Sequence, residues 1–241
     1  MSKRFLLGIL GGMGPLATVD LMYKLLAATP ADSDQQQMPM VVWNVPQVAD
    51  RQQALAGGGR SPLPQLLQGI ARLNQAGASH IVIACNTAHH WFAALSAASA
   101  APILHIADAS LAALLQRDVP PRRAGVIATQ GTLDGGWFQQ RLQQRNIAAV
   151  LPTPQELQQL FVPGCYAVKR GEMALAAQLL TEAGLALKAR GAELLILACT
   201  EVPVALQSIR SPLLQDAIDP TDALARQCAA IWQQQRHAEA G

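Results

Sequence analysis

The sequence predicts an α/β protein of two similar units, each built on a parallel sheet. The first observation is a repeat: residues 77–88 and 191–202 both run from Gly-Ala through an Ile-, Val- and Leu-rich segment to Ala-Cys and small polar residues. The second is that the apolar part of each copy is continuous, which is typical of a strand buried on both faces. Cys85 and Cys199 are therefore expected at the carboxyl ends of equivalent strands, where open α/β sheets place their ligands.

Other parts of the chain repeat in the same order. The glycine-rich segment 8–14 has a counterpart at 125–132, and residues 105–108 are echoed more faintly at 217–220. A repeat of this length indicates a duplicated fold rather than a local motif. Two α/β units of similar topology can place their strand ends across a cleft.

The length of 241 residues fits two domains of ordinary size. We expect domain 1 at residues 1–107 and domain 2 at residues 108–220. The last helix, within 221–241, is expected to pack back on domain 1. The active site is expected in the cleft between the two domains.

In the first half, expected strands alternate with expected helices, and proline and glycine residues mark the boundaries between them. Pro15 suits the first position of a helix, and Asp108 is expected to cap one. The long segment 46–61, which includes three consecutive glycines, is expected to be an irregular lid or binding loop. In order, we expect a strand at 5–10, a helix at 15–28, a strand at 40–44, a helix at 64–75, the first cysteine strand, a short helix to Leu95, a strand at 103–106 and a helix at 108–116.

The second half repeats the alternation. Its longest helical pattern, residues 171–189, leads into the second cysteine strand. The other expected elements are a strand at 124–128, helices at 136–144 and 154–160, and strands at 148–151 and 217–219, followed by a helix at 221–235.

The composition excludes several classes of function. A net charge of +2 with 14% charged residues gives no basic surface for nucleic acid. No stretch has the eighteen or more apolar residues of a membrane helix, and the apolar run after Lys3-Arg4 is too short for a signal peptide. Four cysteines without short paired spacing suggest reduced thiols, so we expect a cytoplasmic protein.

The two repeated cysteines are the candidate catalytic residues. Each precedes small polar residues at the expected start of a helix, where the positive helix end favours a thiolate and lowers the thiol pKa. One such cysteine suggests a nucleophile, whereas a facing pair suggests two acid-base groups on opposite sides of one carbon. Cys165 and Cys228 lie outside the repeat and are expected to be structural.

Two other chemistries fit parts of the first half. Residues 12–17 match the dinucleotide fingerprint, although the next strand ends in Trp43-Asn44 without the acidic residue that binds ribose. A nicotinamide or flavin oxidoreductase is therefore the minor alternative. His89 and His90 follow Cys85, but no second pair has zinc-like spacing, so we expect no metal and at most an influence on Cys85.

Two isolated cations are candidates for binding an acidic substrate. Arg51 lies in the long loop, and Lys169 is expected in a turn between two helices. Both could border the cleft. A substrate with two carboxylates needs cations of this kind.

The motifs together resemble the aspartate/glutamate racemase family, and within it the cofactor-independent aspartate racemases. The resemblance covers nearly the whole chain and is carried by residues 11–18, 44–51, 85–89, 128–132 and 199–201. It implies two pseudo-symmetric α/β domains with the active site between them, in a homodimer. It also implies activity without pyridoxal phosphate or metal.

The resemblance assigns roles to individual residues. Cys85 and Cys199 match the two acid-base cysteines, one removing the α-proton and the other delivering one. Arg51 and Lys169 match the cations that hold the side-chain carboxylate of aspartate. The remaining positions expected to bind substrate are Met13, Asn86, Thr87, Thr129, Thr200 and Glu201.

The substrate implied is aspartate, with racemisation of glutamate or of many amino acids as the alternative. Glutamate racemases have Asp-Ser where this chain has Gly12-Met13, and His where it has Glu201. Both differences favour aspartate. Relatives with one of the two cysteines catalyse other reactions, so the presence of both favours racemisation.

Overall fold

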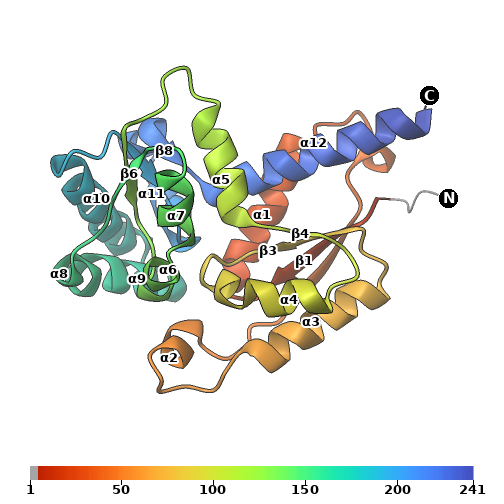
Figure 1. The fold of residues 1–241 in the computed structure, drawn as a ribbon, viewed down its shortest axis with the longest axis horizontal. Coiled ribbons are helices and arrows are strands. Elements are labelled where there is room, and N and C mark those ends of the chain that lie inside the picture. Colours follow the sequence, from red (N-terminus) through yellow and green to blue (C-terminus); the bar gives the residue numbers. More distant parts are fainter. Residues whose placement is uncertain (1–4, 241) are drawn as a thin grey trace. The chain divides into compact units, whose positions relative to one another are not determined.

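Two parallel β-sheets organise the chain (Figure 1). The structure is a computed structural model and describes residues 5–240. The strand order is β2-β1-β3-β4 in one sheet and β6-β5-β7-β8 in the other, and every pair of neighbours is parallel. The same order in both sheets confirms the duplicated α/β fold predicted from the sequence.

Contacts along the chain divide it into two units. Unit 1 contains residues 5–109 and 221–240, and unit 2 contains residues 110–220. The strands of unit 1 are β1 (Leu7–Gly11), β2 (Met40–Asn44), β3 (His80–Ile83) and β4 (Ile103–Leu104). Its helices are α1 (Pro15–Ala28), η1 (Asp34–Gln36), α2 (Arg51–Leu55), α3 (Leu63–Gln75), η2 (Thr87–Trp91), α4 (Phe92–Ala98), the start of α5 (Ile106–Leu115) and α12 (Pro220–Ala240).

Unit 2 repeats the arrangement with shorter strands. They are β5 (Arg123–Val126), β6 (Ala148–Val150), β7 (Leu194–Ile196) and β8 (Ala217–Ile218). Its helices are α6 (Gln130–Gly135), α7 (Trp137–Gln143), α8 (Pro154–Glu156), the π-helical turn η3 (Leu157–Phe161), α9 (Val162–Arg170), α10 (Met173–Ala189), α11 (Glu201–Ser208) and η4 (Pro212–Asp216).

The strand order creates a topological switch point in each sheet. From β1 the chain crosses to β2 on one side, and from β2 it crosses back over β1 to β3 on the other. Right-handed crossovers in opposite directions place α1 and α3 on opposite faces of the sheet. The loops after β1 and β3 therefore lead to opposite faces of the sheet, and such a switch point is where sheets of this type bind ligands. The loops after β5 and β7 stand in the same relation in unit 2.

The duplication extends to individual packing contacts. A Cβ added to Gly8 would lie 2.9 Å from Cβ of Ala78, and one added to Gly125 would lie 3.1 Å from Cβ of Ala192. These glycines and alanines occupy equivalent places in the two repeats. Glycine suits both positions because each strand closely approaches the alanine that lies two residues before the cysteine strand, which leaves little room for a side chain.

The last helix returns to unit 1, where it packs near α1. Thr221 at the start of α12 accepts a hydrogen bond from Nζ of the buried Lys24, at 2.9 Å. Lys24 also forms an ion pair with Asp20, which lies one turn earlier in α1. Residues 5–240 contain no helix with the length and apolarity to span a membrane.

Three local predictions were wrong. The expected irregular loop at 46–61 contains the helix α2, which the Asp50 side chain caps by accepting from the Gln53 amide. Asp108 does not cap α5, because that helix already begins at Ile106. Lys169 lies in the last turn of α9 and not in a turn between helices, because the π-helical turn η3 continues the helical path from α8 into α9.

Candidate active site

Cys85 lies at the switch point of unit 1, directly beyond β3. Its side chain is 5% exposed and belongs to an apolar cluster with Met13, Val48 and Ala88. Met13 follows β1, so the segments after β1 and after β3 both contribute to this cluster. The structure therefore places Cys85 at the carboxyl end of its strand, as the sequence predicted.

The two residues after Cys85 bring polar groups to the same buried place. Asn86 is 3% exposed, and neither atom of its side-chain amide has a hydrogen-bond partner among residues 5–240. The Thr87 hydroxyl accepts a hydrogen bond from Nε2 of Gln52 in α2, at 3.1 Å. A buried amide without a partner is costly to folding. Asn86 is therefore a group that a bound polar ligand would satisfy.

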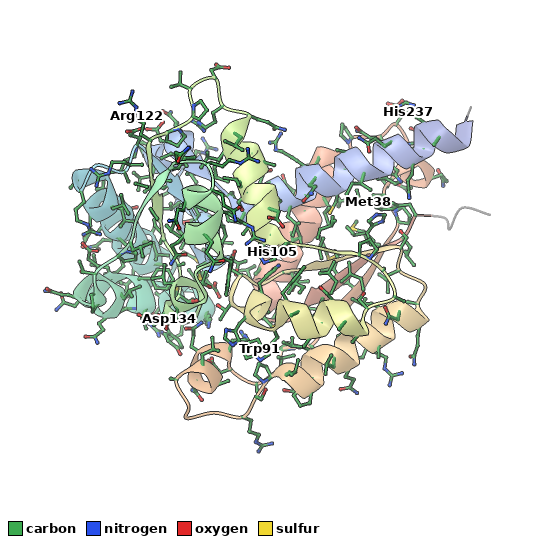
Figure 2. All side chains as sticks on the ribbon, in the orientation of Figure 1. Met38, Trp91, His105, Arg122, Asp134 and His237 are labelled. Carbon is green, nitrogen blue, oxygen red and sulfur yellow. The ribbon has the colours of Figure 1, made fainter. Side chains whose placement is uncertain are left out.

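His89 supports the backbone at Cys85 rather than its thiol. Nδ1 of His89 donates to the Cys85 carbonyl oxygen at 2.9 Å, and Nε2 accepts from the Ile106 amide at 3.3 Å. The ring of His105, labelled in Figure 2, packs against that of His89 at a tilt, with 4.5 Å between ring centroids. Both ring nitrogens of His89 thus bind backbone groups, which holds the segment after β3 against the start of α5. His90 is exposed.

The glycine-rich turn after β1 has a packing explanation. A Cβ on Gly12 would lie 2.3 Å from the carbonyl oxygen of Val45, and a Cβ on Gly11 would lie 2.4 Å from Oγ1 of Thr18. The same Thr18 hydroxyl accepts a hydrogen bond from the Gly12 amide at 2.9 Å. The turn therefore packs closely against the loop after β2 and the first turn of α1. This close packing explains why glycine occupies both positions, with no need for a bound dinucleotide.

Arg51 begins the short helix α2 and is partly buried. One terminal nitrogen, Nη1, donates to the carbonyl oxygens of Val48 and Ala49 at 3.3 and 3.2 Å. Nε is buried and has no partner among the described residues. These contacts fix the plane of the guanidinium group and leave other donors for a ligand. An arginine that holds a carboxylate with two parallel hydrogen bonds uses donors of this kind.

In unit 2, Cys199 occupies the equivalent place beyond β7. It is 6% exposed, and its thiol donates to Oε2 of Glu201 at 3.0 Å. The Thr200 hydroxyl donates to the same oxygen at 3.0 Å. Glu201 is the first residue of α11, so its carboxylate lies at the positive end of that helix. The three residues of the Cys-Thr-Glu motif thus form one hydrogen-bonded group.

Cys165 also belongs to this group. Its sulfur lies 3.8 Å from the sulfur of Cys199, and both side chains are buried. The two sulfurs are within hydrogen-bonding distance, and either thiol can be the donor. The sequence predicted a structural role for Cys165, since it lies outside the repeat. Packing of α9 against α11 nevertheless brings it to the catalytic candidate.

These contacts reverse the expected effect on the Cys199 thiol. Its pKa is raised well above the ordinary value, mainly by the hydrogen bond with Cys165, then by burial and by the neighbouring negative charge of Glu201. The sequence predicted a lowered pKa from the helix end alone. In the structure the helix end is occupied by the Glu201 carboxylate, so Cys199 is held as a neutral thiol.

Two further candidates lie in unit 2. Thr129 follows β5 and caps α6, with its hydroxyl 3.0 Å from that of Thr132. Lys169 is exposed on α9, one turn beyond Cys165, and its Nζ lies 5.0 Å from the centre of the Tyr166 ring. Residues four apart share a helix face, so Lys169 projects on the side of α9 that meets Cys199.

A search of residues 5–240 finds no group of three or more His, Cys, Asp or Glu side chains arranged to hold a metal ion. The polar groups next to Cys85 and Cys199 are hydroxyls, an amide and a carboxylate. Such groups transfer protons and bind a polar ligand.

Known proteins share this fold over nearly the full chain. Broad specificity amino-acid racemase RacX of Bacillus subtilis is 25% identical, over 94% of this chain and 98% of that protein. The structure of Picrophilus torridus aspartate racemase has a TM-score of 0.81 and 29% identity, covering 95% of this chain and 94% of that one. Glutamate racemase RacE1 of Bacillus anthracis has a TM-score of 0.67 at 19% identity, covering 98% and 84%, and shares the fold.

A family model gives the assignment. The model for Asp/Glu/Hydantoin racemase matches residues 10–228, a span that begins in β1 and ends in α12. It thus includes both switch points and all four strands of each sheet except the start of β1. The resemblance inferred from the motifs is confirmed: the chain belongs to the Asp/Glu/Hydantoin racemase family and is an isomerase of the racemase type.

Proposed function

We propose that this protein interconverts L- and D-aspartate by moving protons between the substrate α-carbon and two cysteines, without pyridoxal phosphate or metal. The supporting observation is the equivalence of Cys85 and Cys199, each at the switch point of its own sheet with buried polar residues next to it. In this proposal both cysteines act on the α-carbon of the same substrate molecule. The family resemblance further implies a homodimer, and the spacing of the four cysteines favours the cytoplasm.

The state of Cys199 suggests which thiol begins the reaction. Since Cys199 is held as a thiol by Cys165 and Glu201, it is the proton donor in the resting enzyme. Cys85 then acts first as the base. Its thiolate removes the α-proton, the electron pair remains on the substrate as a carbanion, and the Cys199 thiol delivers its proton to the opposite face of that carbon.

A carbanion next to a carboxylate needs strong stabilisation, because a thiolate is a weak base for this proton. The buried Asn86 amide and the hydroxyls of Thr87, Thr129 and Thr200 are the groups we assign to the α-amino and α-carboxyl groups of the substrate. Met13 closes the apolar side of the site. The three threonine hydroxyls are already held by hydrogen bonds within the protein, and groups preorganised in this way need little reorganisation when charge develops.

Arg51 and Lys169 are assigned to the side-chain carboxylate of aspartate. The fixed guanidinium group of Arg51 retains donors, and Lys169 brings a second charge from α9. The likeness to the Picrophilus aspartate racemase supports this substrate. The likeness to RacX, a broad specificity racemase, supports the alternative that many amino acids are accepted.

The test uses purified protein, free of metal and pyridoxal phosphate, with single enantiomers of aspartate, glutamate and alanine in deuterated water. Circular dichroism follows racemisation, and mass spectrometry follows deuterium at the α-carbon. Cys85→Ser and Cys199→Ser should each abolish racemisation, since a hydroxyl is far less acidic than a thiol. Cys228→Ser, at a cysteine buried in α12, is the control. Near wild-type turnover of Cys199→Ser in both directions would refute the two-thiol mechanism.

A further inference from the structure

Cys165 is a titratable, nucleophilic group that the proposed reaction does not use. It lies on α9, a helix that the sequence repeat does not include, yet its sulfur is 3.8 Å from that of Cys199. A disulfide has a sulfur–sulfur distance of about 2.05 Å, so a further approach of about 1.8 Å would bond the two atoms. Rotation about the side-chain bonds of two neighbouring cysteines covers a distance of this size.

The position of Cys165 is fixed by close packing of its helix. A Cβ added to the preceding residue, Gly164, would lie 2.8 Å from Cγ of Leu180 in α10. The absence of a side chain therefore lets α9 approach α10 closely. The same helix packs against α11, which begins two residues after Cys199. The two sulfurs are thus held together by three packed helices and not by a flexible loop.

We infer that Cys165 and Cys199 form a reversible disulfide that switches the enzyme off under oxidation. The inference rests on the proposed function for the role of Cys199. Joining the sulfurs removes the thiol proton that Cys199 delivers to the substrate. Reversible disulfides of this sort are the usual form in which reducing compartments use cysteine oxidation.

The reaction needs a peroxide as oxidant. One cysteine, as its thiolate, attacks a peroxide oxygen, which breaks the O–O bond and gives a sulfenic acid and an alcohol or water. The second thiolate attacks the sulfur of the sulfenic acid, forms the S–S bond and expels hydroxide, which takes up the released proton as water. Two thiols are oxidised and one peroxide is reduced.

A partner thiol also protects Cys199 from further oxidation. A sulfenic acid without a neighbouring thiol proceeds to the sulfinic acid, which dithiothreitol does not reverse. With Cys165 at 3.8 Å, the sulfenic acid is captured first. The pair therefore converts a destructive oxidation into one that a thiol reductant repairs.

The test treats the reduced full-length protein with hydrogen peroxide at a mildly alkaline pH of about 8.5, where thiolates form more readily. After free thiols are alkylated, peptide mapping should find Cys165 joined to Cys199, with the mass of two hydrogen atoms lost. Aspartate racemisation should fall on the order of 100-fold or more, as expected when an acid-base group is removed, and dithiothreitol should restore it.

Two variants make the result specific. Cys165→Ala should lose the linked peptide, and the fraction of its starting activity that dithiothreitol restores should fall well below that of the wild type. Cys228→Ala should behave as the wild type, because Cys228 is fully buried in unit 1 and lies outside the site. A Cys199 sulfinic acid in the wild type without the linked peptide would overturn the inference, as would a Cys85–Cys199 link that persists in Cys165→Ala.

The readouts separate this inference from the proposed function. Linked peptide in a protein that racemises no amino acid even when reduced would sustain the redox pair and refute the racemase assignment. Full activity in a protein shown to carry the Cys165–Cys199 link would refute the switch.

Discussion

The buried thiol of Cys228 should make unit 1 less stable as the pH becomes alkaline. Cys228 is fully buried in α12, and burial raises the pKa of its thiol to about 12 from an ordinary value of 9.0. At a pH between these two pKa values, the Cys228 thiol is deprotonated in the unfolded chain and stays protonated in the folded protein. Folding stability is therefore complete below about pH 9 and falls as pH rises towards 12.

The size of the effect follows from the two pKa values. At about pH 10.5, some 1.5 units above the ordinary value of 9.0, the loss is about 2 kcal/mol. Urea unfolding of the wild type and of Cys228→Ala at several pH values between about 8 and 10.5 measures it. Other groups that titrate in this range contribute equally to both proteins.

The comparison isolates one thiol. The variant should be less stable than the wild type by a constant amount below pH 9, because a buried sulfur is lost, and the gap should narrow by about 2 kcal/mol at the highest pH. Parallel curves for the two proteins across the whole range would show that Cys228 is not held protonated by burial.

Three further predictions concern the site. Gly12→Ala should destabilise unit 1 by about 3 kcal/mol or more in urea unfolding, because its Cβ would overlap the backbone, while Gly57→Ala, also at positive φ but with open space, should cost about 1 kcal/mol; equal losses would contradict the steric argument. Asn86→Leu should unfold at equal or higher urea concentration than the wild type and lose racemisation, because the buried amide has no partner among the described residues; a large loss of stability would assign it a structural role. Arg51→Ala should lower kcat/KM for aspartate by a factor that corresponds to about 2 to 5 kcal/mol of activation free energy, and kcat/KM for alanine far less. Lys169→Ala should have a weaker effect in the same direction. Equal proportional losses for both substrates would refute the assignment of these cations to the side-chain carboxylate.

The sequence predicted the features that depend on strand composition. Buried parallel strands are continuous apolar runs, so β3 and β7 and the cysteines beyond them could be placed without a structure. The helix α1 and the strand β2 have the bounds that the sequence indicated. Proline marks the start of the helix, and proline residues flank the strand on both sides.

The short helix α2 could not be predicted in the same way. Its five residues, Arg51–Leu55, are too few to show helical periodicity, and three glycines follow at once. The N-cap bond from Asp50 and contacts such as that of Gln52 with Thr87 stabilise it. Arg51, which was expected on an irregular loop, is thus held at the start of a helix.

The contact between Cys165 and Cys199 depends on tertiary packing alone. Thirty-four positions separate the two residues, and only the second lies in the repeat. The one local indication was Gly164, a small residue next to a cysteine within a helical segment, which is typical of closely packed helices. This stretch was expected to be a turn between two helices, but α9 runs through it, with proline accommodated in the first turn of that helix.

The return of α12 to unit 1 has a consequence for synthesis on the ribosome. Thr221, the hydrogen-bond partner of Lys24, is translated only after the whole of unit 2. At usual elongation rates, residues 110–240 require roughly 7 to 26 seconds. During this interval the nascent amino-terminal segment has its four strands but lacks the helix that completes it. Unit 2 is continuous in the chain, so it can finish folding first, and the order of maturation runs opposite to the order of translation.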